Sequence, residues 1–591
     1  MLTAVGQLCS TSNVSRNLAV ARDLIKQAAK ANAKVLFLPE ATDFIAPREQ
    51  VKDLSENLEH PGGFVEGVRK QAKESGVWIN IGVHERGPDD ENGRCYNTNL
   101  LIDDRGDIVS SYRKVHLFDV AITGGTHIME SSTTIRGNEI VPPRRTPAGK
   151  LGLATCFDLR FPELSLSLRR KGAEIISYPS AFTVKTGKAH WETLLRARAI
   201  ETQCYVFAAA QAEADEGAIA TAEVDLESLH QIRREIPLWE QRRNDVYPEL
   251  NDELPADRDD PNRRAESTVF GTSVQSSLSS GPSLAPSRSL LHHPALVDHR
   301  NLDMSQKAFV ACGQMCSTND PSHNALLACS IIRRAAKLSA KLVMLPEGCD
   351  FIGTPDEVRE LSKPLEESTF LNAVRKQAKE SSCWVSTGVH ESSEVEGRVY
   401  NSNVVIDSDG NIASKYEKIH LLDVDVQGGD STQESELVLE GKRLTDPVQT
   451  PVGKLGLQVC YDLRFPEGAR VLRSKGAQLI GYNAAWTART GPPHWEVLLR
   501  ARAIENQAYV LAPDQIGEHP SGRQSYGHAM IISPWGDILA QCADRPPAKA
   551  KEQSEDDGEF CMAEIDIAWC EELRESMPLM DQRRTDIYNA V

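Results

Sequence analysis

Three residue types that can perform nucleophilic catalysis together occur twice in this chain, at nearly constant spacing. The first set is Glu40, Lys114 and Cys156, and the second is Glu347, Lys418 and Cys460. In both sets the lysine precedes the cysteine by 42 residues. A thiolate attacks carbon, a carboxylate can take the thiol proton, and a cationic lysine can stabilise an oxyanion. The repeated set predicts attack on an amide or nitrile carbon through a thioester.

The sequence around each cysteine is part of a longer repeat. Residues 150–163 read KLGLATCFDLRFPE, and residues 454–467 read KLGLQVCYDLRFPE. A single cysteine at the end of a strand is usually a small buried core residue, and duplication alone would also preserve core positions. Three residue types that recur together at matched spacing nevertheless favour a catalytic set over three unrelated core or surface residues.

Each cysteine is expected at an elbow between a strand and a helix. Residues 151–155 are almost continuously apolar, which predicts a strand buried on both faces. Pro162 suits the first turn of a helix, where its missing N–H needs no partner. We therefore expect the positive end of that helix to point toward the sulfur of Cys156 and, by the repeat, of Cys460. Glu40 and Glu347 each end an apolar run that closes with Leu-Pro-Glu.

The rest of each copy predicts an α/β domain. Residues 14–28 carry apolar side chains at helical spacing after the cap candidates Ser12 and Asn13. Residues 35–38, 77–82 and 98–102 are predicted to be strands. Strands that alternate with helices indicate layers in which helices cover a sheet.

The repeat divides the 591 residues into two predicted domains and a linker. Copy 1 spans residues 1–248 and copy 2 spans residues 305–591. The stretch 249–304 is rich in Ser, Pro, Asp and Arg and lacks a sustained period, so it is predicted to be a disordered linker. Met304 directly precedes copy 2, which fits either a fusion of two reading frames or an error of gene modelling.

Composition excludes several classes of function. A net charge of −18 argues against a nucleic-acid or anionic-membrane surface, which would need basic patches. No apolar run approaches the ~18 residues of a membrane span, and Met1 leads directly into the first strand pattern, without a signal or transit peptide. The 13 cysteines form no paired framework, so a reducing, cytoplasmic location is expected. Cys312 and Cys316 have a metal-like spacing that copy 1 does not repeat, and no metal site is predicted.

The two copies diverge after Gln211 and Gln515. The offset between equivalent residues rises from 304 there to 341 at Pro237 and Pro578, so copy 1 lacks about 37 residues. In copy 2 this stretch is predicted to form two strands joined by a turn at residues 534–537. Its apolar side chains are Met530, Ile531, Ile532, Ile538 and Leu539. Their loss would remove about 7–15 kcal/mol at ~1.5–3 kcal/mol each, comparable with the whole stability of a domain. We therefore expect a damaged scaffold in copy 1 and a dependable catalytic unit in copy 2.

The motifs resemble the three signatures of the nitrilase superfamily of carbon–nitrogen hydrolases. The matching segments are Leu38-Pro-Glu40, Tyr112-Arg-Lys114-Val-His-Leu117 and the residues that begin at Cys156, together with their counterparts in copy 2. The resemblance implies an αββα four-layer sandwich in each copy, a Glu-Lys-Cys triad, dimers or larger oligomers, and no cofactor. It also implies a supporting second glutamate, which falls at Glu130 and Glu434.

Copy 1 is most similar to the deaminated glutathione amidase branch. The similarity lies in His84-Glu-Arg-Gly, in residues 178–182 and in the segment that starts at His190. It implies hydrolysis of deaminated glutathione to 2-oxoglutarate and cysteinylglycine. Copy 2 shares His390-Glu and the segment at His494, but reads YNAAW at 482–486 where copy 1 reads YPSAF, so its substrate assignment is weaker.

Alternative functions remain open at this point. The first is ω-amidase, nitrilase or carbamoylase activity on another small substrate. In the second, copy 1 is a non-catalytic interaction module that pairs with copy 2. A small-molecule amide is the expected substrate, and the expected assembly is a homo-oligomer or a pairing of the two copies within the chain. Arg160 and Arg464 are candidates either for binding an acidic substrate or for a buried ion pair that supports the elbow. The resemblance also allows a mitochondrial form.

Overall fold

The computed structural model describes residues 1–89, 91, 93–121, 127–212, 217–247, 307–426, 431–544, 554 and 557–588. The predicted linker at 249–304 lies outside the described residues. Copy 1 and copy 2 belong to one compact unit, formed by Met1–Asn251 and Gln306–Val591.

Copy 1 contains two main sheets. The first has the strand order β13-β1-β2-β3-β4-β5, with β8 on β4, and the second has the order β12-β11-β10-β9. The strands are β1 (Leu2–Gln7), β2 (Val35–Phe37), β3 (Trp78–Arg86), β4 (Cys95–Ile102), β5 (Ile108–Arg113), β8 (Thr134–Ile135), β9 (Arg144–Thr146), β10 (Gly149–Leu153), β11 (Ile175–Ser177), β12 (Tyr205–Phe207) and β13 (Ala218–Glu223); β6 (Asp119–Ala121) and β7 (His127–Met129) form a separate ribbon.

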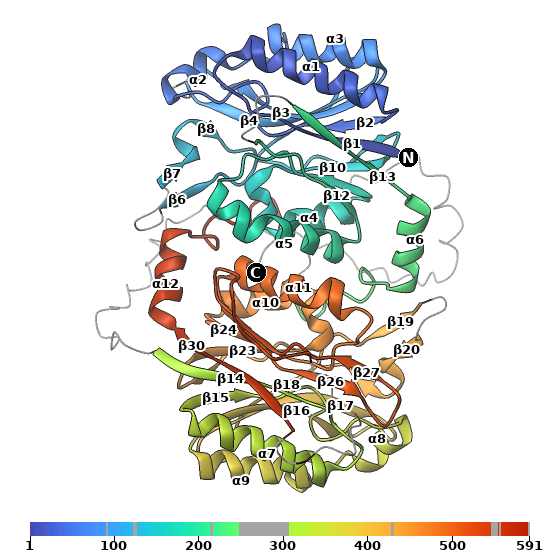
Figure 1. Ribbon diagram of the computed structural model, residues 1–591, viewed down its shortest axis with the longest axis vertical. Helices are drawn as coiled ribbons and strands as arrows, with labels where there is room; N and C mark the ends of the chain where they lie inside the picture. The colour runs from blue at the N-terminus through green and yellow to red at the C-terminus, as the bar shows by residue number, and fades with distance from the viewer. Residues whose placement is uncertain are drawn as a thin grey trace, which may run out of the picture. The chain divides into compact units, whose positions relative to one another are not determined.

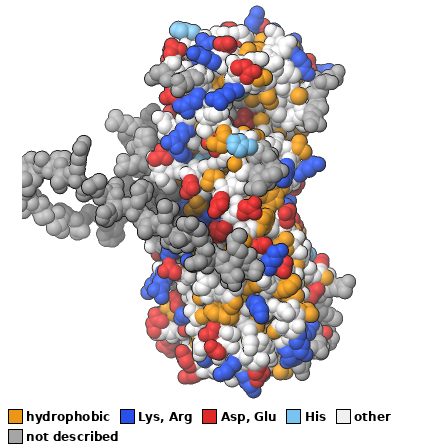
Figure 2. Space-filling model, turned by 90° about the vertical axis from the view of Figure 1, so that its left-hand side faces the viewer, with side chains coloured by type: hydrophobic (Ala, Val, Ile, Leu, Met, Phe, Trp, Pro, Cys, Tyr) orange, Lys and Arg blue, Asp and Glu red, His pale blue; other side chains and the backbone are white. Residues whose placement is uncertain are grey.

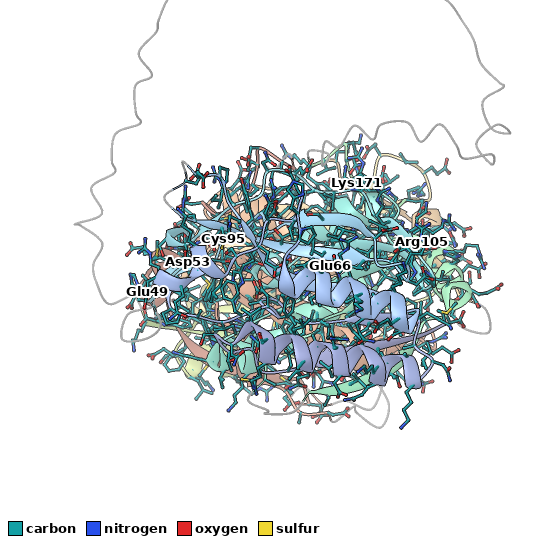
Figure 3. The ribbon with its side chains drawn as sticks, turned by 90° about the horizontal axis from the view of Figure 1, so that it is seen from above. Glu49, Asp53, Glu66, Cys95, Arg105 and Lys171 are labelled. Carbon is teal, nitrogen blue, oxygen red and sulfur yellow. The ribbon has the colours of Figure 1, made fainter. Side chains whose placement is uncertain are left out.

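Helices cover the outer faces of both sheets. They are α1 (Val14–Lys30), α2 (Arg48–Leu54), α3 (Gly63–Ser75), α4 (Pro162–Arg170), α5 (Val184–Thr202) and α6 (Leu226–Glu235). Helix α1 begins at Val14, and the side chain of its N-cap Asn13 accepts a hydrogen bond from the Arg16 N–H, as the capping pattern predicts. Helices α1 and α3 lie side by side over the first sheet (Figure 3).

The inner faces of the two sheets meet in an apolar layer. Phe37 of the first sheet stacks on Phe207 of the second, with ring centroids 4.5 Å apart, and both belong to one buried cluster with Leu153 and Ile175. The order of layers in each copy is therefore helix, sheet, sheet, helix (Figure 1). This arrangement confirms the αββα sandwich predicted from the sequence.

Copy 2 repeats this architecture with larger sheets. Their orders are β18-β17-β16-β15-β14-β26-β27, with β30 on β14 and β21 on β17, and β22-β23-β24-β25-β28-β29. The strands are β14 (Lys307–Met315), β15 (Ala340–Met344), β16 (Trp384–Ser392), β17 (Val399–Ile406), β18 (Ile412–Glu417), β19 (Asp423–Asp425), β20 (Ser431–Gln433), β21 (Val438–Leu439), β22 (Val448–Thr450), β23 (Gly453–Val459), β24 (Leu479–Asn483), β25 (Tyr509–Ala512), β26 (Asp514–Glu518), β27 (Gln524–Tyr526), β28 (Met530–Ile532), β29 (Ile538–Gln541) and β30 (Glu559–Asp566). The helices are α7 (Pro321–Lys337), α8 (Pro355–Leu361), α9 (Thr369–Ser381), α10 (Pro466–Ser474), α11 (Gly491–Asn506) and α12 (Ile567–Ser576).

The stretch that copy 1 lacks holds more than the predicted strand pair. Strands β28 and β29 are that pair, and β26 and β27 form a second pair at the edge of the first sheet. Among the described residues of copy 1, a single bridge between Leu8 and Gln211 stands where β14 pairs with β26. The expectation of one missing pair was therefore wrong, because the short polar run around residues 519–523 separates two further strands.

The two copies contact each other through buried charges on α5 and α11. Arg502 Nη1 of α11 lies 2.6 Å from Glu201 Oε1 of α5, and Arg198 of α5 pairs with Glu505 of α11. All four side chains are buried. Removing one member of such a set would leave an uncompensated buried charge, which is strongly destabilising. These contacts hold copy 1 against copy 2.

The surface carries charges of both signs. On the face shown in Figure 2, acidic and basic side chains are interspersed over both copies. Within the described parts of the chain, no helix has both the length and the apolar character needed to cross a membrane.

Candidate active site

The predicted residues of copy 2 meet at the ends of three strands. Lys418 directly follows β18, Cys460 directly follows β23, and Glu347 comes shortly after β15. Lys418 Nζ lies 3.0 Å from Glu347 Oε1, and Cys460 lines the same cavity as both residues. All three side chains are buried. The structure thus brings the predicted glutamate, lysine and cysteine together although they come from both sheets.

The second glutamate holds the other side of the lysine. Both carboxylate oxygens of Glu434 lie 2.9 Å from Lys418 Nζ. Glu434 Oε2 also accepts a hydrogen bond from the Leu422 N–H. Lys418 is therefore fixed between two carboxylates rather than paired with one.

Copy 1 repeats this geometry. Lys114 Nζ lies 3.0 Å from Glu40 Oε1 and 2.8 Å from Glu130 Oε2. Burial and the Glu40 charge raise the pKa of the Cys156 thiol well above its ordinary value. The polar network of copy 1 is thus complete despite the missing stretch.

The charges of the site favour a base-assisted thiol over a preformed thiolate. Burial alone would raise the pKa of Glu347, but the charges of Lys418 and Arg523 lower it to about 2. Burial and the Glu347 charge raise the pKa of the Cys460 thiol well above its ordinary value. Lys418 stays cationic because its two carboxylates outweigh burial and raise its pKa. An ionised carboxylate thus stands beside a neutral thiol and can accept its proton.

Sequence reasoning missed two groups that orient the glutamate. Asn401 Nδ2 donates to Glu347 Oε1 over 2.7 Å, and the Ala485 N–H donates to Oε2 over 2.9 Å. Asn97 and Ala181 make the same contacts to Glu40 in copy 1. The available signal was the Tyr-Asn pair that recurs at equivalent strand positions in both copies.

The elbow at each cysteine is backbone-strained. Cys156 and Cys460 have φ angles of 47° and 44°, in the left-handed region that residues other than glycine rarely adopt. A short 3-10 turn, Cys460–Arg464, follows the nucleophile, and α10 begins only at Pro466. The helix begins at Pro466, and at Pro162 in copy 1, as the sequence predicts, and the 3-10 turn lies between the sulfur and the helix. Strain of this kind is common at functional sites.

Arg160 and Arg464 are buried beside histidines. Arg464 Nη1 lies 3.2 Å from His494 Nδ1, and Arg160 Nη2 lies 2.9 Å from His190 Nδ1. Within the described ranges, no carboxylate forms an ion pair with either arginine. Arg464 is also absent from the described lining of the cavity at Cys460. Substrate binding by these two residues stays a prediction.

A cavity of about 450 Å³ opens onto the candidate residues of copy 2. Its lining includes Glu347, Lys418 and Cys460, and also Arg523. Arg523 lies between β26 and β27, in the stretch that copy 1 lacks, and it donates to the Ala485 carbonyl. Sequence reasoning missed this cation, although the deletion marked the segment that carries it.

No group of three or more His, Cys, Asp or Glu side chains in the described residues is arranged to hold a metal ion.

Both copies match a known protein family. The carbon-nitrogen hydrolase family matches residues 2–234 and 309–575. A deaminated glutathione amidase from Bos taurus is 40% identical over 289 residues, covering 48% of this chain and 84% of that protein. The probable hydrolase nit2 of Schizosaccharomyces pombe is 42% identical over 280 residues, covering 42% of this chain and 99% of that protein.

Among solved structures, Nit3 of Saccharomyces cerevisiae, described as a member of branch 10 of the nitrilase superfamily, is 31% identical. The match covers 48% of this chain and 98% of that one, with a TM-score of 0.42. Because the family matches both copies across most of their length, the chain belongs to the carbon-nitrogen hydrolase family, within the nitrilase superfamily, and is a hydrolase of carbon–nitrogen bonds.

Proposed function

We propose that copy 2 is a thiol amidase that works through a thioester on Cys460. The observation that carries this proposal is the ionised carboxylate of Glu347, which hydrogen bonds to Lys418 and shares its cavity with a neutral, buried thiol. Glu347 is the general base, Cys460 the nucleophile and Lys418 the oxyanion donor. Glu434 keeps the lysine charged and in place.

The first half of the reaction forms the thioester. Glu347 takes the Cys460 proton as the sulfur attacks the amide carbon, and the developing oxyanion faces Lys418. The carbon–nitrogen bond then breaks, and Glu347 passes its proton to the leaving nitrogen. In the second half, Glu347 takes a proton from water, the hydroxide attacks the thioester, and the proton returns to the thiolate as the acid leaves.

Deaminated glutathione is the proposed substrate, with 2-oxoglutarate and cysteinylglycine as products. Relatives that bear this activity in their names are about 40% identical to the chain. The Arg523 guanidinium at the cavity also suits a substrate with a carboxylate. ω-Amidase, nitrilase and carbamoylase activities are the alternatives, and the cation favours acidic amides among them.

The test is hydrolysis of deaminated glutathione by the full chain, with release of cysteinylglycine as the readout. Cys460→Ala should stop turnover, and mass spectrometry of a quenched reaction should find the acyl adduct on Cys460. Turnover of a neutral amide such as propionamide at an equal kcat/KM would contradict the acidic substrate. An adduct on another cysteine would contradict the assignment of the nucleophile.

For copy 1 we propose pairing with copy 2 as a second function, because buried ion pairs join α5 to α11. None of the 13 cysteines forms a disulfide, which supports a reducing compartment such as the cytoplasm.

A further inference from the structure

The C-terminal end of each copy lies on the other copy. We call residues 241–247 tail 1 and residues 582–588 tail 2. Both tails read Gln-Arg-Arg-x-Asp-x-Tyr, with x variable. Tail 1 comes after the stretch that copy 1 lacks, so the deletion leaves tail 1 entire.

Tail 1 binds the backbone that follows Lys418. Arg243 Nη1 donates to the carbonyls of Ile419 and Gly441 over 2.8 and 2.9 Å. The Tyr247 hydroxyl lies 3.0 Å from Nε2 of His420. Tyr247 and His420 are both buried, at 2% and 1% exposure. The contact is therefore a fixed part of the interior rather than a surface encounter.

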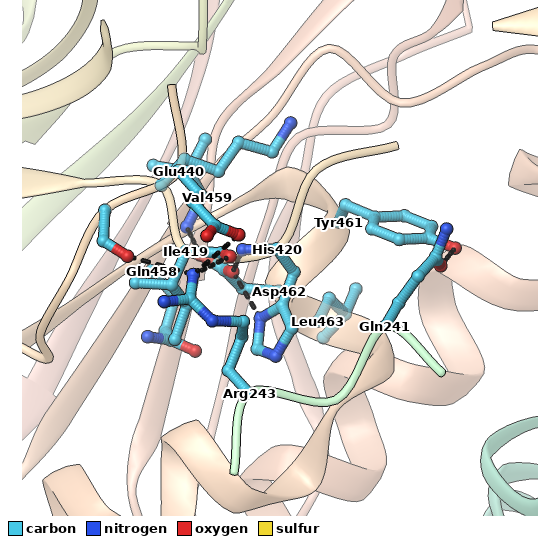
Figure 4. Close-up of polar contacts among 12 residues, drawn as sticks. Gln241, Arg243, Ile419, His420, Glu440, Gln458, Val459, Tyr461, Asp462 and Leu463 are labelled. Atoms are coloured by element: carbon cyan, nitrogen blue, oxygen red, sulfur yellow. Dashed lines mark hydrogen bonds and ion pairs between the residues drawn. The ribbon is translucent and has the colours of Figure 1, made fainter. Parts of the chain in front are cut away.

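His420 in turn hydrogen bonds to Asp462, in the elbow that follows Cys460 (Figure 4). Its Nδ1 lies 2.7 Å from Asp462 Oδ1, while Asp462 Oδ2 accepts the Val459 N–H over 2.8 Å. His420 stands two residues after Lys418, and Asp462 stands two residues after Cys460. The hydrogen bond between His420 and Asp462 thus joins the segment after Lys418 to the elbow at Cys460. Tyr247 of copy 1 hydrogen bonds to the other ring nitrogen of His420.

A second contact reaches the neighbour of the nucleophile. The Tyr461 hydroxyl donates to Gln241 Oε1 over 2.7 Å. Copy 1 has Phe157 at the equivalent position, which has no hydroxyl to donate. The other bond of the two glutamines is shared, since Gln241 donates to the Asp423 carbonyl and Gln582 to the Asp119 carbonyl. Tail 1 therefore holds the elbow of copy 2 by a bond that tail 2 does not repeat on copy 1.

We propose that copy 1 acts as an internal subunit whose tail 1 positions Lys418 and Cys460 of copy 2, so that the site of copy 2 is incomplete without copy 1. This inference rests on the proposed amidase function of copy 2. Tyr247 is a positioning residue that acts through His420, since it lies outside the described lining of the cavity. The arrangement gives copy 1 a role that its missing strands do not impair.

The test uses the full chain with Cys156→Ala, so that turnover reports Cys460. The compared variants are Tyr247→Phe and Tyr588→Phe, which remove the same hydroxyl from equivalent positions. Tyr588 lies 2.6 Å from His116 Nε2 of copy 1. The Tyr247 hydroxyl bonds to His420 Nε2 and accepts the Arg243 N–H. Its loss predicts a fall of about three- to tenfold in kcat for Tyr247→Phe, with KM changed less than twofold, and a smaller fall for Tyr588→Phe. Equal falls in both variants, or a lowered melting temperature with kcat retained, would overturn the proposal.

A second measurement does not need turnover. The rate of Cys460 alkylation by iodoacetamide, followed by mass spectrometry, should fall in Tyr247→Phe more than in Tyr588→Phe. Gln241→Leu against Gln582→Leu repeats the comparison if the tyrosine variant does not fold. If the parent chain hydrolyses no amide, the proposed function fails, while the alkylation rates still decide the role of tail 1. Equal alkylation rates in the paired variants would refute it.

Discussion

Copy 1 and copy 2 each have the same arrangement of polar catalytic residues, but the sheets that carry it differ. The lysine-to-glutamate distance is 3.0 Å in both, yet the second sheet ends at β12 in copy 1 and continues through β28 and β29 in copy 2. The comparison shows that the polar network depends on the strands both copies keep. The wall of the substrate cavity depends on the stretch that copy 1 lacks, because that stretch carries Arg523.

The missing turn also leaves a space beside α5. In copy 2, Gly536 of the turn between β28 and β29 sits against Ile504 of α11 and accepts a hydrogen bond from Arg500. In copy 1, the equivalent Ile200 instead lines a cavity of about 300 Å³ with other side chains of copy 1 and with Arg464 and His494 of copy 2. The apolar part of an unfilled cavity forgoes packing contacts. Copy 1 therefore keeps its catalytic geometry at a cost in stability.

The largest expected difference is in the activity lost when each of the two cysteines is replaced. Cys460→Ala in the full chain should abolish amide hydrolysis, because alanine cannot attack carbon. Cys156→Ala should leave most of the activity, since copy 1 lacks the Arg523 side of the cavity. Initial rates at saturating substrate measure both. Equal losses would show that the copies contribute equally.

The lysines give the next contrast. Lys418→Met should lower kcat by about 10²–10³, the usual cost of a lost oxyanion donor, with a much smaller change in KM. Lys114→Met is the matched variant and should change the total rate far less. An effect of Lys418→Met on KM alone would make the lysine a substrate-binding residue instead.

Arg523 should set the substrate preference of copy 2. Loss of a charge-assisted hydrogen bond costs about 1.5–3 kcal/mol, so Arg523→Ala should lower kcat/KM for deaminated glutathione about 10- to 100-fold. Turnover of a neutral amide should change little. Parallel losses on both substrates would place the effect of Arg523 on Glu347 and Cys460 rather than on the substrate.

Much of this was visible in the sequence. Apolar runs and helical spacing predicted helices that cover a sheet, because they mark strands and helices locally, and the family resemblance implied the αββα order of layers. The repeat named Glu347, Lys418 and Cys460, and the resemblance added Glu434; the structure places these residues together. The positions of Arg523 and of the two tails were not predicted, because an exposed polar run and a C-terminal segment give no local sign of the site that they approach. The 3-10 turn at Cys460 was not predicted either, since Pro466 marks the start of the helix but not the turn before it.

The smallest expected effect concerns acid stability, and it compares Glu347 with Glu40. The lowered pKa of Glu347, about 2 against an ordinary 4.5, means that the ionised group stabilises the fold. This contribution is fully present above about pH 4.5 and is lost as the pH falls toward 2, with an upper size of about 3 kcal/mol. Burial would raise the pKa of Glu40, but the Lys114 charge and hydrogen bonds such as that of Asn97 together lower it, without a counterpart of Arg523. Glu347→Gln should therefore flatten the fall in melting temperature between pH 5 and pH 3 more than Glu40→Gln does. Calorimetry across that range measures the difference, and identical slopes in the two variants would mean that Arg523 adds nothing to the carboxylate of copy 2.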